Sequence, residues 1–160
     1  MDEVLTALEL TVGEKGALIE VDHLGTLIGD ATQLAQLFQN LLINALKFSK
    51  SHVPPHIRVS SQMVNVAHLP ERFQPPGSQE SFCAIWVTDN GIGFDPEQAE
   101  RIFGTFQRLH GKSQYPGIGI GLAIAKKVVA NHGGYIMAES QVGQGATFTI
   151  YLPTTNPDAE

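Results

Sequence analysis

The sequence is poor in charge and in cysteine, and it lacks long apolar runs. Asp, Glu, Lys and Arg make up 16% of 160 residues, against about a quarter in average globular proteins. The net charge is −6 and no run of Lys or Arg occurs, which disfavours nucleic-acid binding. One cysteine, Cys83, excludes an internal disulfide and is typical of a reducing compartment. We therefore expect a cytoplasmic chain.

Membrane contact is not expected either. No stretch approaches about 18 uninterrupted apolar residues, the minimum for a spanning helix. The first ten residues are acidic, so we expect no secretory signal there. The length suits one domain. We place this domain at 15–153, with 1–14 as a first helix or the remnant of a connection to another domain, and 154–160 as a disordered tail.

Apolar periodicity predicts the elements. We expect helices over 4–14, from the N-cap Asp30 to about Ser49, over 96–106 and over 122–131, and strands over 17–21, 56–66, 82–88, 135–139 and 146–152. The loop 67–81 is longer than such a fold requires, and 109–117 should be mobile. Helices grouped between antiparallel hairpins indicate an α+β fold: a two-layer α/β sandwich whose mixed, mainly antiparallel sheet is covered on one face by helices.

Two glycine-rich segments could bind a nucleotide. D-N-G-I-G-F, at 89–94, ends a strand; its aspartate can accept a hydrogen bond from an amino group, or it can simply cap a tight turn. G-I-G-I-G-L, at 117–122, leads into a helix, where exposed N–H groups attract phosphate; the alternative is a flexible loop before a helix. The second segment does not match the dinucleotide-binding spacing, and the sequence contains no P-loop motif.

The long helix carries a polar face that could bind a metal. Asn40, Asn44 and Lys47 follow one another at i, i+4 and i+7, on one side of the helix. An amide oxygen can hold Mg²⁺ beside water and phosphate, although such residues can also be an ordinary solvated face. A last segment, G-Q-G-A-T-F at 143–148, is typical of a hairpin turn.

Together, in this order, the segments resemble a known family. N-L-L-I-N-A-L-K-F, D-N-G-I-G-F, I-F-G-T-F-Q-R-L-H, G-I-G-I-G-L-A-I and G-Q-G-A-T-F look like the asparagine, first glycine, phenylalanine, second glycine and final glycine boxes of sensor histidine kinase catalytic domains, of the gyrase-like ATPase superfamily. The likeness covers about 17–153. The sequence at 29–48 looks like that of phytochrome-type kinases. It implies an α/β sandwich that binds Mg-ATP beneath a mobile lid.

The resemblance also implies residue roles. Asn44 matches the Mg²⁺ ligand, Asn40 and Lys47 the phosphate site, Asp89 the acceptor of the adenine amino group, and Arg108 a lid arginine that reaches the phosphates. Phe103 and Phe106 match lid anchors. The remaining cofactor-binding positions it implies border the adenine or lie under the phosphates: Phe48, Gly91, Gly93, Gly117, Gly119, Gly121, Leu122 and Thr147. Ile118 departs from the family, which often has threonine there; we expect weaker ATP binding from this change.

None of the six histidines lies in a phospho-acceptor motif. The resemblance therefore predicts a catalytic domain that phosphorylates a histidine on a separate dimerisation domain, with a response regulator further along. Two other functions stay open: an ATP hydrolase, disfavoured because Asn40 stands where that branch has a glutamate, and a nucleotide-sensing or docking module without transfer.

Overall fold

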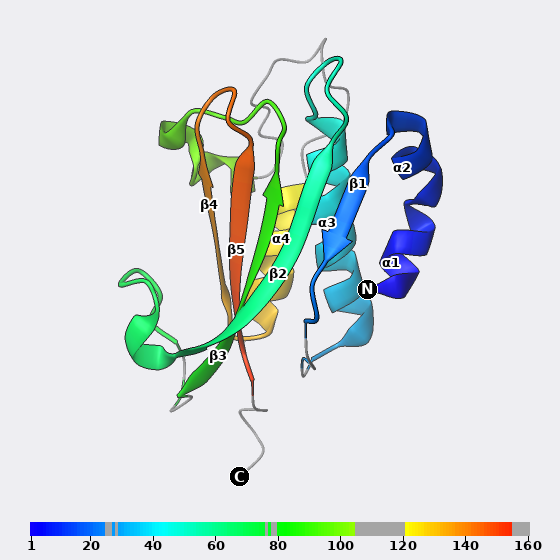
Figure 1. Cartoon of the computed structure of the whole chain (residues 1–160). Coiled ribbons are helices and arrows are strands. Elements are labelled where there is room, and N and C mark those ends of the chain that lie inside the picture. The colour runs from blue at the N-terminus through cyan, green and yellow to red at the C-terminus, as the bar shows by residue number, and fades with distance from the viewer. Residues whose placement is uncertain (25–26, 28, 76, 78–79, 105–120, 155–160) are drawn as a thin grey trace.

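A five-stranded sheet forms one layer of the protein and helices form the other. The computed structural model describes residues 1–24, 27, 29–75, 77, 80–104 and 121–154. The strands are β1 (Leu18–Val21), β2 (His56–Asn65), β3 (Ser81–Asp89), β4 (Tyr135–Ser140) and β5 (Ala146–Pro153), in the order β1-β2-β3-β5-β4. Only the β1–β2 pair is parallel among the described strands. Helices α3 (Ala31–Lys47) and α4 (Gly121–Asn131) cover one face (Figure 1), so the predicted fold class is confirmed.

Helix α3 forms where the sequence predicts it. The Asp30 carboxylate accepts a hydrogen bond from the Gln33 N–H at 2.9 Å and so caps the first turn. The apolar stripe of the helix is buried against the sheet: Leu37, Phe38, Leu41, Leu42, Ala45 and Leu46. This packing fixes the direction in which the opposite, polar side of the helix points.

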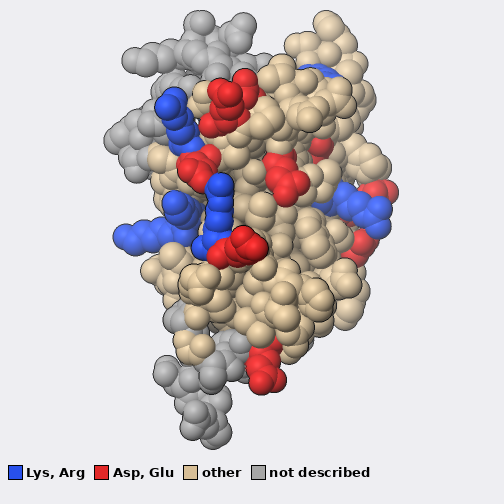
Figure 2. Space-filling model, turned by 90° about the vertical axis from the view of Figure 1, so that its left-hand side faces the viewer, with Lys and Arg blue, Asp and Glu red and all other residues tan. Residues whose placement is uncertain are grey.

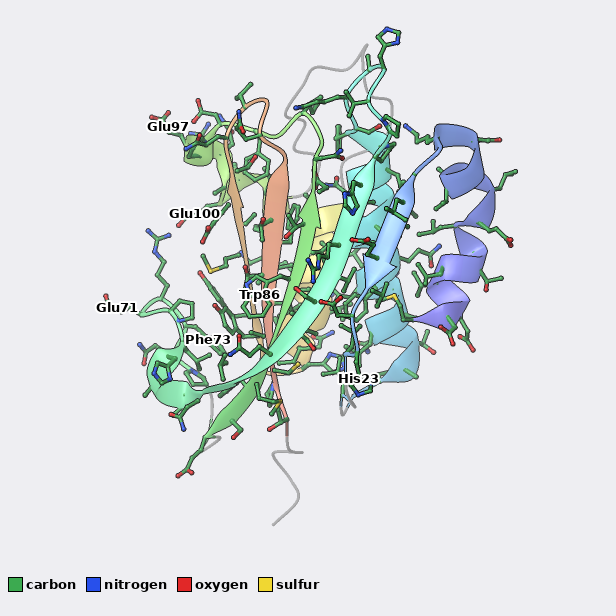
Figure 3. All side chains as sticks on the ribbon, in the orientation of Figure 1. His23, Glu71, Phe73, Trp86, Glu97 and Glu100 are labelled. Atoms are coloured by element: carbon green, nitrogen blue, oxygen red, sulfur yellow. The ribbon has the colours of Figure 1, made fainter. Side chains whose placement is uncertain are left out.

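The strands alternate between the helix layer and the outer face of the sheet. In β3, Cys83, Ile85 and Val87 belong to the core shared with the helices. Trp86 lies on the outer face, as does Phe73 from the long loop after β2 (Figure 3). The Phe73 ring stacks on Tyr135 at a centroid distance of 5.4 Å and meets Phe82 edge-on at 5.6 Å. The long loop therefore covers apolar surface on the outer face.

The N-terminal segment is two helices rather than the predicted single one. Helix α1 (Asp2–Ala7) ends at Leu8, whose φ and ψ are −98° and 0°, and α2 (Glu9–Lys15) begins after it. Val4 and Leu8 are buried in the same core as α3 and the sheet. Packing of these two side chains bends the segment around α3, an outcome that helical periodicity alone does not reveal.

The predicted helix over 96–106 is also wrong in its described part. Two 3₁₀ turns occur instead, Pro96–Gln98 and Arg101–Phe103, with i→i+3 hydrogen bonds such as Gly104 N–H to Arg101 C=O. The adjacent residues Ile102 and Phe103 are both buried, and this anchoring holds the second turn in place. Residues 105–120 and 155–160 lie outside the described residues, so the predicted lid and most of the predicted tail do too.

A histidine joins the start of α3 to the end of α4. The His132 Nε2 accepts a hydrogen bond from the Asp30 N–H at 3.0 Å, so Nδ1 carries the proton and donates to the Val128 carbonyl at 2.7 Å. A Cβ atom on Gly29 would lie 2.5 Å from the His132 ring. His132 is thus structural. Within the part of the chain that the structure describes, no helix is long and apolar enough to cross a membrane.

Candidate functional site

A pocket opens between the last turns of α3, the end of β3 and the start of α4. Its lining brings together residues that are far apart in sequence: Asn44, Phe48, Asp89, Gly93, Phe94, Leu122, Ala146 and Phe148. Five of these lining residues were predicted to bind a nucleotide: Asn44, Phe48, Asp89, Gly93 and Leu122. Phe94, Ala146 and Phe148 were not predicted, although the alternation of β5 marks Ala146 and Phe148 as inward-facing.

Asp89 is the ionisable group of the pocket lining. Its Oδ1 accepts a hydrogen bond from the Gly91 N–H at 2.8 Å. Burial raises the pKa of the Asp89 carboxyl above its ordinary value, and hydrogen bonds from the backbone of Gly91 and Ala146 oppose this rise. The result is a partly buried carboxylate, held in one orientation, that can accept a hydrogen bond from an amino group.

The loop after Asp89 is fastened to the end of α3. The Ile92 N–H donates to the Phe48 carbonyl at 3.0 Å. A Cβ atom on Gly91 would lie only 2.5 Å from that carbonyl oxygen. Glycine at this position therefore allows the close approach that places Asp89 and Asn44 on one pocket.

The β4–β5 hairpin closes the pocket from the other side. Ser140 Oγ accepts a hydrogen bond from the Phe94 N–H at 2.9 Å and donates to the Gly145 carbonyl. Gly93 has a φ of +67°, and a Cβ there would lie 2.3 Å from the Gln141 carbonyl oxygen. Ser140, which sequence reasoning missed, thus ties the first glycine segment to the hairpin.

Gly145→Ala should destabilise the fold and distort the pocket. Its φ is +76° and the new Cβ would lie 2.0 Å from the Asp89 carbonyl oxygen. Gly143→Ala is the matched control, because its φ is +84° but nothing lies within 4 Å. The positive φ alone costs about 1–2 kcal/mol, so the free energy of unfolding in urea should fall by that amount for Gly143→Ala and by clearly more for Gly145→Ala. Equal losses would contradict the close contact.

The polar face of α3 contains an unsatisfied donor. Asn40 Nδ2 is the buried side-chain nitrogen or oxygen atom without a hydrogen-bond partner among the described residues. It lies one turn before Asn44, which lines the pocket. Lys47 does not line this pocket; its Nζ lies 5.5 Å from the centre of the Phe48 ring, at the adjoining end of α3. A buried donor without a partner suits an anionic oxygen of a ligand.

Thr147 is not brought to the pocket. It pairs with Thr88 across β5 and β3, and the two hydroxyl oxygens are 3.3 Å apart on the outer face of the sheet. The neighbouring Ala146, opposite Asp89, faces the pocket instead. The strand alternation is the physical reason, because adjacent residues point to opposite faces. Ala146 rather than Thr147 therefore lines this pocket, while Thr147 shares a shallower depression with Asp89 on the hairpin side.

The other predicted site residues divide into two groups. Gly121 is the first residue of α4, directly before the pocket residue Leu122. Phe103 meets Phe148 edge-on, with ring centres 6.2 Å apart, and so supports the pocket wall. Arg108, Gly117 and Gly119, together with Phe106 and Ile118, lie outside the described residues.

These residues fit a nucleotide with its divalent cation. Asp89 offers an acceptor for an amino group on a flat ring, and Phe48 and Phe148 offer apolar walls. Asn44 offers an amide oxygen of the kind that Mg²⁺ accepts beside phosphate and water. The unpartnered Asn40 Nδ2 offers a donor to phosphate oxygens. The donor set matches Mg²⁺ bound mainly through phosphates rather than through a protein cage.

The chain is similar in sequence to known proteins. Residues 29–156 match a sequence model described as "Histidine kinase-, DNA gyrase B-, and HSP90-like ATPase". The chain is 41% identical over all 160 residues to cyanobacterial phytochrome A of Nostoc sp., covering 19% of that protein. The chain thus spans about a fifth of this curated relative.

Solved structures show the same fold. The mycobacterial sensor histidine kinase MprB matches with a TM-score of 0.69 and 28% identity, over 96% of this chain and 93% of that one. Full-length ShkA, solved in complex with AMPPNP, matches with a TM-score of 0.69 and 24% identity, over 98% of this chain and 30% of that one. At that identity the second match speaks for the fold alone.

Proposed function

Because the chain belongs to the family of histidine kinase-, DNA gyrase B- and HSP90-like ATPases, we propose that it is the ATP-binding catalytic domain of a sensor histidine kinase. It binds Mg-ATP and transfers the γ-phosphoryl group to a histidine on a separate dimerisation domain. The observation that carries this proposal is that Asn44 and Asp89 line the same pocket. The relation to phytochrome and sensor kinases supports it.

The described residues have distinct tasks in this proposal. Asp89 accepts the adenine amino group and so orients the base. Asn44 supplies an oxygen to Mg²⁺, which neutralises phosphate charge. Asn40 donates to a phosphate oxygen, and Lys47 adds positive charge at the same end of α3. A nitrogen of the incoming imidazole then forms a bond to the γ-phosphorus, the bond to the β,γ-bridging oxygen breaks, and ADP leaves.

The same residues favour transfer to histidine over hydrolysis. A hydrolase needs a base that activates water, and the amide of Asn40 cannot accept a proton. A response regulator as the next acceptor, and a cytoplasmic location, belong to this proposal because they accompany such kinases. The role of Arg108 in reaching the phosphates is part of it as well.

The decisive experiment mixes the chain with a histidine-containing dimerisation domain from a phytochrome-type kinase and γ-labelled ATP. We expect acid-labile label on the added domain, almost none on this chain alone, and slow release of free phosphate. Nucleotide binding without transfer to any such domain would favour the sensing or docking module. Rapid turnover by the chain alone would favour the hydrolase.

Asn40→Glu should raise ATP hydrolysis modestly. A well-placed general base contributes roughly 10²–10⁴-fold, but water must also be positioned in line, so we expect an increase of only about a few-fold. Asn40→Gln is the control, since it has the length of glutamate without its basicity. Phosphate release under saturating Mg-ATP is the measurement. An equal rise in both variants would show that the carboxylate is not acting as a base.

A further inference from the structure

A second, larger hollow lies between α3 and the N-terminal helices, and it shares no lining residue with the nucleotide pocket. It encloses about 1000 Å³ between the N-terminal helices and the last turns of α3. In Figure 1, α1 and α2 lie beside α3 at the β1 edge of the sheet. We call it the α1–α3 groove, and define it by its lining: Ala7, Leu8, Thr11, Lys15, Gln39, Ile43, Leu46, Lys47, Ser49, Lys50 and Ser51.

The groove lining carries charge of one sign. It contains three lysines and no Asp or Glu, in a chain whose net charge is −6 and which has only 10 basic residues. None of these three lysines takes part in the ion pairs that occur among the described residues. By contrast, the face shown in Figure 2 has basic side chains lying among acidic ones. The groove is thus a local positive site on an acidic protein.

Helix ends explain only part of this charge. Lys15 and Lys47 lie in the last turns of α2 and α3, where a cation offsets the helix dipole. Lys15 also donates to Ser49 Oγ at 3.3 Å. Lys50 follows the end of α3 and has no such role. The groove therefore holds positive charge beyond what the helix ends require.

The groove also exposes apolar surface. Ile43 lies in the middle of the groove-facing side of α3 and is 40% exposed. The break at Leu8, which bends α1 against α2, lies in the opposite wall. The exposed apolar residues of the groove are Ile43 on α3 and Ala7 on α1, whereas Leu8 and Leu46 are buried beneath them. Exposed apolar side chains bordered by lysines are features of a groove that receives an amphipathic helix.

We propose that the α1–α3 groove binds an acidic amphipathic helix of a partner protein. The apolar side of that helix lies on Ile43, and its carboxylates face Lys15 and Lys50. Charge complementarity carries the choice of an acidic partner, because opposite potentials steer encounter and exclude partners of like charge. Of the groove lysines, Lys47 also has a task in the kinase proposal. Lys15, Ile43 and Lys50 have none, and the binding of the helix rests on these three residues.

The test measures fluorescence anisotropy of labelled synthetic peptides on the full chain. The first peptide is a helix with leucines at i, i+3, i+4 and i+7 and glutamates beside them. The second has lysines in place of the glutamates, and the third keeps the glutamates without the leucines. We expect a Kd below about 100 µM for the first, and at least tenfold weaker binding for the other two.

Variants locate the binding site. Lys15→Glu with Lys50→Glu, and separately Ile43→Ser, should each weaken binding of the first peptide at least tenfold. The control is Lys126→Glu with Lys127→Glu, an equal charge change on exposed positions of α4, which should leave the Kd within twofold. ATP binding and urea unfolding check that each variant is folded.

Three results would overturn the proposal. The first is absence of binding by the acidic amphipathic peptide. The second is an unchanged Kd in folded Lys15→Glu, Lys50→Glu protein. The third is equal binding of the acidic peptide without leucines, which would mean that the lysines attract anions without selecting a helix.

Discussion

Asp89→Asn is expected to weaken ATP binding about ten- to a hundredfold, because a hydrogen bond to a charged group contributes roughly 1.5–3 kcal/mol. The Gly91 N–H donates to Oδ1. An asparagine that keeps this bond turns its NH₂ group toward the ligand, where it meets another donor, the adenine amino group. Isothermal titration with ATP is the measurement.

Asp95→Asn provides a matched control for this prediction. Asp95 accepts a hydrogen bond from the N–H two residues later, at Glu97, as Asp89 does from Gly91. It has the same charge and the same local turn, but it does not line the pocket. ATP affinity should be unchanged in this variant. A loss as large as that of Asp89→Asn would mean that the adenine assignment is wrong.

The raised pKa of the Asp89 carboxyl gives this prediction a pH dependence. ATP binding should weaken as pH falls through the folded-state pKa, which lies above that of an ordinary aspartate. The free energy of unfolding depends on pH in the opposite direction to ATP binding. Between the unfolded and folded pKa values the folded state binds more protons, so stability falls as pH rises through this window. At neutral pH, Asp89→Asn should therefore bind ATP more weakly without a fall in its free energy of unfolding.

Asn44→Ala should abolish the effect of Mg²⁺ on ATP binding. The alanine removes the amide oxygen that we assign to the ion; loss of a residue that only supports a metal ligand already costs about 10–100-fold in metal affinity. ATP affinity measured with and without Mg²⁺ should differ in the wild type and coincide in the variant. Gln36→Ala, at an exposed position of the same helix, is the control. Unchanged Mg²⁺ dependence in Asn44→Ala would show that the ligand is elsewhere.

Much of this site could be predicted because its signals are local. The apolar stripe of α3 and the N-cap Asp30 determine which way Asn44 points. The glycines of D-N-G-I-G-F mark a turn after a strand, where the structure places Asp89. Alternation in β5 also held information that was overlooked: Ala146, Phe148 and Ile150 are buried, so Thr147 must face the other way.

The errors came from tertiary packing. The bend at Leu8 depends on how Val4 and Leu8 meet α3, and periodicity is the same for one helix or two. The 3₁₀ turns near Phe103 depend on the burial of adjacent side chains. The contacts of Ser140 join segments 46 residues apart, and no local pattern in the sequence specifies such a bond.

The contact between Gly29 and His132 has a consequence for how this family varies. A side chain at position 29 would overlap the His132 ring, and the same ring accepts the Asp30 N–H. The two positions therefore cannot change independently. Among relatives, a residue larger than glycine at position 29 should occur together with loss of the histidine at 132, and sequences that keep the histidine should keep the glycine. Such covariation would couple the start of one helix to the end of the other across evolution.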